Sequence, residues 1–227
     1  MERKVKLVRG EYYHLYSRGV EKRKIFLDVK SYERFMALLY IMNQHSAFHF
    51  TNFLKNHKIE KIFDEPKDKC LVSILSYTLM PNHFHILVHE NEEGGISKFM
   101  GRLLTAYSMY FNTKYERSGP LFTHPFRSQH ISEESQFLWI FSYIHLNAIG
   151  IIKKDFKTNG IGNKNLAEKF LKSYQYSSYL DYCGVNRPES KILDLSMIPD
   201  YLLNKKLTIE EYNQKNIEYQ ENIKYQG

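Results

Sequence analysis

Two β-strand patterns separated by a turn signal constrain this chain more than any other feature of its sequence. Residues 71–79 and 84–89 are rich in branched and aromatic side chains, and Pro81-Asn82 between them favours a turn. Successive side chains of a strand point to opposite faces. The second strand therefore has two faces, with His83, His85 and His89 on one and Phe84, Ile86 and Val88 on the other. We expect an antiparallel hairpin whose apolar face packs against helices and whose histidine face is exposed.

This hairpin lies inside a longer alternation of strands and helices. The other expected elements are a strand over residues 11–17, a helix over 31–42, a helix over 96–111 and a strand over 126–131. Asp28 or Ser31 is the expected N-cap of the first helix. The resulting order, β-α-β-β-α-β, predicts an α+β, ferredoxin-like fold with one antiparallel sheet and both helices on one face.

A further helix and a basic tail follow the last strand. Ser132, Glu133 and Glu134 form a capped, acid-rich start, and the helix is expected to run to about Asn147. The sequence after it is more basic and polar, so we expect one domain over residues 1–150 and an extension over 151–227 packed on it. Residues 51–69 look like a solvated, mobile connection of mixed charge.

The charge balance favours a polyanionic partner. Lysine and arginine number 32 against 25 aspartates and glutamates, which gives a net charge of +7, and the pI is about 9.1. Aromatic residues make up 15% of the chain, and aromatic faces can stack on unpaired bases. Charge alone fits a merely basic soluble protein equally well, and packing in the core is the alternative role for most of these rings.

Composition also sets expectations about location and cysteine chemistry. No apolar run reaches the length of a membrane span, and the first residues lack the apolar stretch of a secretory signal, so a cytoplasmic protein without membrane contact is expected. Cys70 and Cys183 lie far apart and have no metal-type spacing, so we assign them no chemical role.

The His-x-His strand and one tyrosine suggest a metal-assisted reaction. His83 and His85 project in parallel and can coordinate one divalent ion, although a solvated face that happens to carry histidines is the simpler alternative. Tyr143 and Asn147 are four residues apart on the last helix, hence on one face. Two imidazoles and an amide form an uncharged set of ligands that suits Mg²⁺ or Mn²⁺ better than structural zinc.

Such a site can perform phosphoryl transfer. The phenol oxygen of Tyr143 attacks a backbone phosphorus, the ion neutralises charge on the non-bridging oxygens, and a 3′-hydroxyl leaves. The product is a covalent 5′-phosphotyrosine. The sequence does not identify the group that accepts the phenol proton, and with 18 tyrosines in the chain any single one is more often structural than catalytic.

These motifs resemble the single-tyrosine HUH transposases, in particular the REP-associated tyrosine transposases. The two most specific segments are Pro81-Asn82-His83-Phe84-His85 and Tyr143-Ile144-His145-Leu146-Asn147. The other matching segments are residues 13–19, 25–26, 86–88, 110–128 and 176–179. Together they span about residues 10–180, while residues 181–227 match nothing and receive no role.

The resemblance implies a catalytic domain that cuts and rejoins single-stranded DNA near a hairpin formed by a palindromic repeat. It implies His83 and His85 as ligands of Mg²⁺ or Mn²⁺, Tyr143 as nucleophile and Asn147 as third ligand. Relatives commonly continue with Asn-Pro, whereas this chain has Asn147-Ala148, which leaves the end of the helix open.

The expected partner is hairpin-bearing single-stranded DNA. The expected DNA contacts are Arg18, Arg102, Arg117 and Arg127, each of which has a solvated surface charge as its alternative. Related insertion-sequence enzymes are dimers that exchange the tyrosine helix, whereas the REP-associated group tends to be monomeric, so a monomer is favoured here.

Two other functions fit the same residues. A replication or plasmid-transfer nickase uses similar chemistry, but such proteins often show a further tyrosine or a third histidine near the motif. A domesticated, non-cutting binder of structured DNA or RNA requires only the basic surface. The complete set of two histidines, tyrosine and asparagine favours the transposase.

Overall fold

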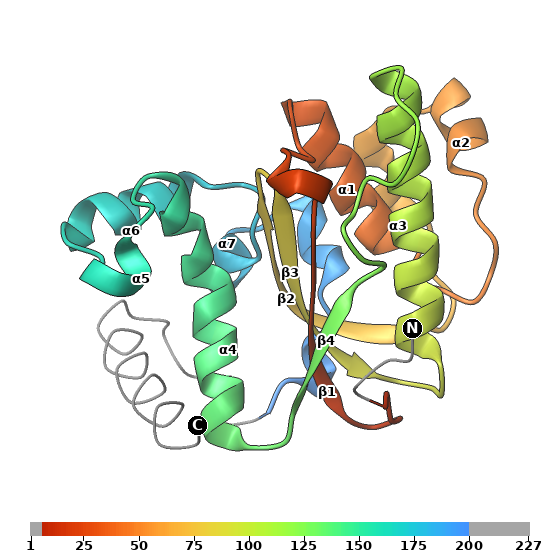
Figure 1. Cartoon of the computed structure of the whole chain (residues 1–227). Helices are drawn as coiled ribbons and strands as arrows, with labels where there is room; N and C mark the ends of the chain where they lie inside the picture. The colour runs from red at the N-terminus through yellow and green to blue at the C-terminus, as the bar shows by residue number, and fades with distance from the viewer. Residues whose placement is uncertain (1–5, 200–227) are drawn as a thin grey trace.

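A four-stranded antiparallel sheet forms the centre of the protein, with the strand order β2-β3-β1-β4 (Figure 1). The structure is a computed structural model that describes residues 6–199. The strands are β1 (Tyr12–Arg18), β2 (Val72–Met80), β3 (His83–Glu90) and β4 (Arg127–Ile131). With the helices between them, they form the ferredoxin-like β-α-β-β-α-β arrangement that the sequence predicts.

Helices α1 (Val29–Ile41) and α3 (Gly95–Lys114) cover one face of the sheet (Figure 1). Asp28 is the N-cap of α1, since its Oδ1 accepts a hydrogen bond from the Ser31 backbone N–H at 2.8 Å. The main hydrophobic core lies between these helices and the apolar side of the hairpin. It includes Phe35, Leu39, Ile86, Val88, Phe99 and Leu103.

Helix α4 (Glu134–Leu146) packs on the opposite face of the sheet (Figure 1). This face carries the histidines, since Tyr143 of α4 lies against the His85 ring. The expectation that this face is exposed was wrong, because His85 and His89 are only 6% and 8% exposed. Leu75 and Leu87 accompany the histidines on this face, and burying them against apolar side chains of α4 is favourable. The cluster includes Leu75, Leu87, Phe137, Ile140 and Ile144.

Both ends of α4 differ in detail from the sequence-based expectation. The N-cap position is Glu133 rather than Ser132, and its side chain makes no capping hydrogen bond. After Leu146 the chain continues as a 3₁₀ helix, η3 (Asn147–Ile151). Without a proline after Asn147, the helical path tightens instead of ending.

The segment between α1 and β2 is more structured than a solvated connection. It forms α2 (Phe50–Asn56) and a 3₁₀ helix, η2 (Ile59–Asp64), and η2 packs on α1. Ile62 and Phe63 are buried in the main core. The many lysines of this segment hide these apolar residues in the sequence, so the expectation of a wholly solvated loop was wrong here.

The chain after η3 forms short helices. Its elements are α5 (Phe156–Asn159), α6 (Lys164–Ser173), α7 (Tyr179–Tyr182), η4 (Pro188–Ile192) and η5 (Leu195–Met197). A second apolar cluster joins α5, α6 and α7 to β2 and η3, and includes Met80, Leu146, Ile149, Phe156, Leu171 and Tyr179. Ile192 of η4 is buried in the main core, and Met197 of η5 packs against the cluster under α4. The described part of the extension is therefore packed on the sheet domain. The expected extension to residue 227 continues beyond the described residues.

Residues 176–178 run along the outer edge of β2. The Leu79 N–H donates to the Tyr176 carbonyl at 2.9 Å, and the Ser178 N–H donates to the Tyr77 carbonyl at 3.0 Å. Thr78 and Ser177 form an isolated antiparallel bridge. The extension therefore satisfies backbone groups that an edge strand would otherwise leave unpaired.

No helix among residues 6–199 is long and apolar enough to cross a bilayer. Cys70 and Cys183 are both free thiols.

A buried ion pair holds residues 176–178 at the edge of β2. The Arg187 guanidinium donates to the Asp181 carboxylate at 2.6 Å and to the Ser177 carbonyl at 2.6 Å. The two side chains are 10% and 6% exposed. We predict that Arg187→Met lowers the free energy of unfolding by about 3–5 kcal/mol, because it leaves a buried carboxylate unpaired. Urea unfolding followed by circular dichroism measures this change.

Lys172→Met is the matched control, because Lys172 pairs with Glu168 on the surface of α6. We expect this variant to change the free energy of unfolding by no more than about 1 kcal/mol. Equal effects of the two substitutions would contradict the role given to the buried pair.

Candidate active site

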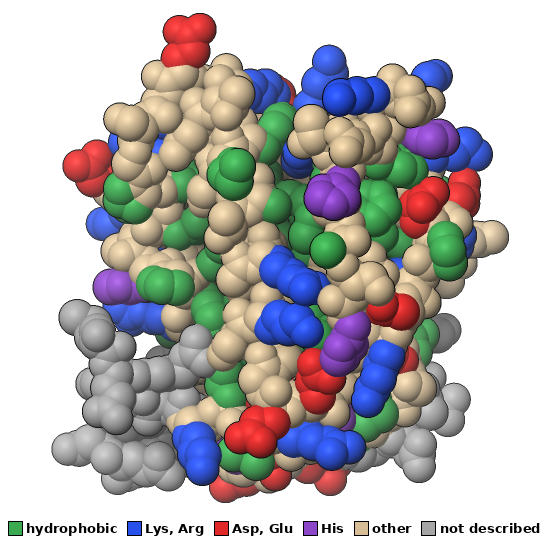
Figure 2. Space-filling model, turned by 90° about the vertical axis from the view of Figure 1, so that its right-hand side faces the viewer, with side chains coloured by type: hydrophobic (Ala, Val, Ile, Leu, Met, Phe, Trp, Pro, Cys, Tyr) green, Lys and Arg blue, Asp and Glu red, His purple; other side chains and the backbone are tan. Residues whose placement is uncertain are grey.

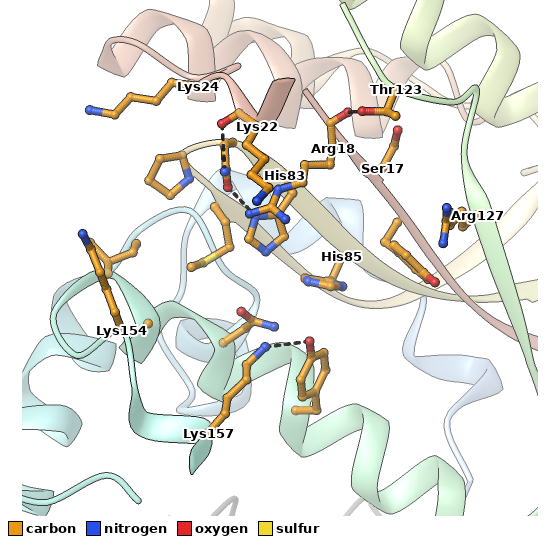
Figure 3. A pocket seen from close by; sticks show the side chains of 18 of the residues that line it. Ser17, Arg18, Lys22, Lys24, His83, His85, Thr123, Arg127, Lys154 and Lys157 are labelled. Atoms are coloured by element: carbon orange, nitrogen blue, oxygen red, sulfur yellow. Dashed lines mark hydrogen bonds between the residues drawn. The ribbon is translucent and has the colours of Figure 1, made fainter. Parts of the chain in front are cut away.

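A pocket of about 1040 Å³ lies where β1, β3 and α4 meet the start of the extension (Figure 3). Four of the predicted site residues line it: His83 and His85 from β3, Tyr143 from α4 and Asn147 from η3. One chain supplies all four. The packing of α4 over the sheet therefore brings together residues that are about 60 positions apart in the sequence.

The rings in the pocket are close together. The Tyr143 ring lies 5.4 Å from the His85 ring and nearly perpendicular to it, and the His83 ring is 5.0 Å from the His85 ring. Trp139, one helical turn before Tyr143, stacks on the tyrosine ring at 4.9 Å. Tyr16 of β1 also lines the pocket, 5.9 Å from the His85 ring. The pocket thus contains two tyrosines.

Asn82 orients His83. The Asn82 side-chain Nδ2 donates to the Lys22 carbonyl at 3.1 Å, which leaves Oδ1 facing His83 Nδ1 at 2.7 Å. Because an amide oxygen only accepts, Nδ1 carries the proton and Nε2 keeps its lone pair. A ring nitrogen held in this way is the usual support of a metal-binding histidine.

The turn after β1 holds Asn82 in position. The Gly19 N–H donates to the Asn82 carbonyl at 2.9 Å, and this turn continues into the 3₁₀ helix η1 (Val20–Lys22). A Cβ at Gly19 would lie 2.5 Å from the Arg23 carbonyl oxygen, so a larger residue does not fit without a backbone shift. This close approach explains why the strand ends in Arg-Gly.

His14 supports His85. The His14 Nε2 and His85 Nδ1 atoms are 2.8 Å apart, and the buried His14 ring lies against both the Tyr16 and the His85 rings. When His85 donates from Nδ1, its Nε2 carries a lone pair. That Nε2 is buried and has no hydrogen-bond partner among the described residues. A buried acceptor without a protein partner is available to a ligand, and a cation is a ligand that suits it.

Burial keeps these imidazoles neutral. It lowers the pKa of His83 to about 4, with further lowering by the charges of Arg18 and Lys157. Burial also lowers the pKa of His14 to about 3 and holds the pKa of His85 well below its ordinary value. Neutral imidazole is the form that binds metal ions, so the site is ready for metal at neutral pH without losing protons.

The donor set fits a divalent ion. Asn147 is 2% exposed, and its Nδ2 has no partner among the described residues; a rotation of the amide presents its oxygen instead. No group of three or more His, Cys, Asp or Glu side chains within residues 6–199 is arranged to hold a metal. Two imidazoles and one amide oxygen are therefore the protein ligands available here, a set compatible with Mg²⁺ or Mn²⁺.

Two of the four predicted DNA-contacting arginines lie at this pocket. Arg18 and Arg127 line it, and lysines extend the positive rim, namely Lys22, Lys24, Lys154 and Lys157 (Figure 3). Arg102 instead donates to the backbone carbonyls of Gln44 and His45.

Arg117 likewise lies outside the pocket and binds the Asn112 side chain and the Pro120 carbonyl. On the side of the molecule that carries α2 and α3, Lys and Arg are interspersed with Asp and Glu (Figure 2). The structure therefore does not bring Arg102 and Arg117 to the site.

Sequence reasoning missed three residues with direct contacts to the site: His14, Asn82 and Lys157. Strand alternation offered a signal for His14, which lies on the β1 face opposite the core residues Tyr13 and Leu15. Asn82 was read only as a turn residue. Lys157 donates to the Tyr143 phenol oxygen at 2.8 Å. No sequence pattern marks it among the many lysines of the extension.

Two comparisons with known proteins found similarity to this chain. Residues 11–147, more than half of the chain, match the family described as "Transposase IS200 like". A solved structure described as "Structure of the REP associates tyrosine transposase bound to a REP hairpin" is similar, with 12% identity and a TM-score of 0.47. The similarity covers 92% of this chain and 98% of that chain. No curated protein matches.

The matched family segment begins just before β1 and ends at Asn147, so it contains every strand of the sheet and the whole of α4. It includes His83, His85 and Tyr143, the residues whose rings meet in the pocket. On the extent of this match, the chain belongs to the IS200-like family of transposases, and its activity lies in DNA transposition.

Proposed function

We propose that this protein is a metal-dependent single-stranded DNA endonuclease and strand transferase that acts through a covalent 5′-phosphotyrosine on Tyr143. One observation carries the proposal: within a single chain, the Tyr143 ring lies 5.4 Å from His85 in a pocket that also contains His83 and Asn147. A phenol beside two neutral imidazoles with free lone pairs suits phosphoryl transfer.

The four residues in the pocket have different roles in this reaction. His83, His85 and Asn147 would hold a divalent ion, and that ion would supply positive charge beside the scissile phosphate. The Tyr143 phenol oxygen bonds to phosphorus as the bond from phosphorus to the 3′ oxygen breaks. The phenol loses a proton and the 3′ oxygen gains one, so the net charge is unchanged. A later 3′-hydroxyl reverses the step and joins new ends.

The positive rim supports a nucleic-acid substrate. Arg18 and Arg127 flank the pocket on the β1 and β4 side, and Lys154 and Lys157 flank it on the extension side. A single strand that crosses the pocket would meet cations on both sides of the scissile phosphate. The resemblance of the motifs makes a strand next to a palindromic hairpin the proposed substrate.

A complete site within one chain also supports a monomer. In a dimer that exchanges the tyrosine helix, each site would take its nucleophile from a partner. Here α4 packs on its own sheet through Leu75, Leu87 and Ile140, and Tyr143 meets histidines of the same chain. We propose that the protein cuts DNA as a monomer.

The proposed function makes a prediction about the nucleophile. Incubation of the protein with a 3′-labelled, hairpin-bearing single strand and Mn²⁺ is expected to yield a labelled protein–DNA adduct that survives denaturing electrophoresis. Tyr143→Phe is expected to reduce the adduct to background, because no phenol oxygen remains to attack phosphorus. A 5′ label on the same strand reports the released 3′-hydroxyl fragment.

Tyr16→Phe is the control, since Tyr16 is the other tyrosine that lines the pocket. We expect this variant to keep the adduct. Adduct lost in Tyr16→Phe but kept in Tyr143→Phe would assign the nucleophile to Tyr16. Tight, salt-sensitive binding with no cleavage by the parent at any Mn²⁺ concentration would instead favour the non-cutting binder.

The proposed function also makes a prediction about the metal. Asn82→Ala removes the oxygen that holds His83 Nδ1, so Mn²⁺ should bind about 10–100-fold more weakly, as measured by calorimetry without DNA. His83→Ala is expected to weaken binding further, because a ligand is lost. Asn52→Ala, at an exposed position on α2, should leave the affinity unchanged. Unaltered Mn²⁺ binding in His83→Ala would place the metal elsewhere.

A further inference from the structure

The ammonium of Lys157 lies against the proposed nucleophile. Its Nζ donates to the Tyr143 phenol oxygen at 2.8 Å and lies 4.4 Å from the centre of the tyrosine ring (Figure 3). No other hydrogen bond to this oxygen is present among the described residues. A positive charge that donates a hydrogen bond to the reacting oxygen stabilises negative charge on that oxygen.

The extension determines where this lysine lies. Lys157 is exposed, but the preceding residue, Phe156, is buried in the second apolar cluster. The turn is also held locally, since the Thr158 and Asn159 backbone N–H groups donate to the Asp155 carbonyl at 3.0 and 2.9 Å. Lys157 is thus held beside the pocket by a buried anchor, although it lies outside the family segment of residues 11–147.

The geometry points to Lys157 as a catalytic residue that stabilises negative charge on the Tyr143 oxygen during both cleavage and rejoining. This inference rests on the proposed function. In cleavage the phenol O–H bond breaks and its proton passes to water. The bond from the oxygen to phosphorus forms as the bond to the 3′ oxygen breaks, and the 3′ oxygen takes a proton from water.

In rejoining, a 3′-hydroxyl attacks phosphorus and the electron pair of the phosphorus–tyrosine bond returns to the phenol oxygen. Cleavage and rejoining share one transition state, in which that oxygen carries more negative charge than in the neutral phenol or in the phosphate ester. A cation that donates to it stabilises the transition state more than the neutral phenol or the ester. Lys157 therefore accelerates cleavage and rejoining by similar factors, and leaves the balance between them nearly unchanged.

Lysines near a DNA-cutting pocket also bind phosphates, and the experiment separates the two roles. A phosphate contact improves affinity for DNA, whereas stabilisation of the phenol oxygen raises the rate once DNA is bound. Single-turnover cleavage at saturating hairpin DNA with Mn²⁺, together with DNA affinity measured separately, distinguishes these effects.

We expect Lys157→Met to slow single-turnover cleavage about 100-fold and to slow rejoining by a similar factor, within about threefold. The affinity for DNA should change much less than the rate. Lys157→Arg, which keeps a cationic donor, should recover most of the loss. Lys169→Met removes an equal charge from an exposed position of α6 outside the pocket and should cleave at the parental rate.

Circular dichroism and the Tm of each variant establish that it is folded. A parental cleavage rate in Lys157→Met with weakened DNA binding makes Lys157 a phosphate contact and overturns the inference, while the proposed function stands. Slowed cleavage that Lys157→Arg does not recover also overturns it. A parent that forms no Tyr143 adduct overturns both the proposed function and this inference.

Discussion

The packing of α4 on the histidine face of the sheet is the contact on which the candidate site depends. Leu75 and Leu87 give that face an apolar surface, and Phe137, Ile140 and Ile144 cover it. Water is displaced from the same area where His85 lies, so the imidazole loses its hydration and stays neutral. The same contact brings the Tyr143 ring close to His85. Hydrophobic burial thus assembles the polar site.

Around this contact, uncharged groups form two chains of hydrogen bonds, one that orients His83 and one that orients His85. Lys22 and Gly19 fix Asn82, which fixes the His83 ring, and His14 faces the His85 ring. Each of these contacts uses a hydrogen bond without a net charge. The positive charges lie at the rim, where an incoming phosphodiester would meet them. This separation keeps the proposed metal ligands uncharged and places the positive charges at the entrance of the pocket.

The sequence predicted the strands and the two helices on one face, because alternation along β3 and the turn at Pro81-Asn82 are local properties. It did not predict that α4 buries the histidines, since alternation shows which residues share a face and not what covers that face. Nor did it separate Arg18, at the pocket, from Arg102, which binds backbone carbonyls, because an arginine has the same sequence signature in either position. Lys157 reaches the site only through the fold of the extension.

The pairing of residues 176–178 with β2 has a consequence for where the functional unit ends. The family segment stops at Asn147, yet the outer backbone groups of β2 find their partners about thirty residues later. A fragment that ends at Asn147 would leave the outer edge of β2 unpaired, and unpaired strand edges can pair with one another and cause aggregation. The extension therefore covers part of the β2 edge, and the folded unit of this protein is longer than the segment that matches its family.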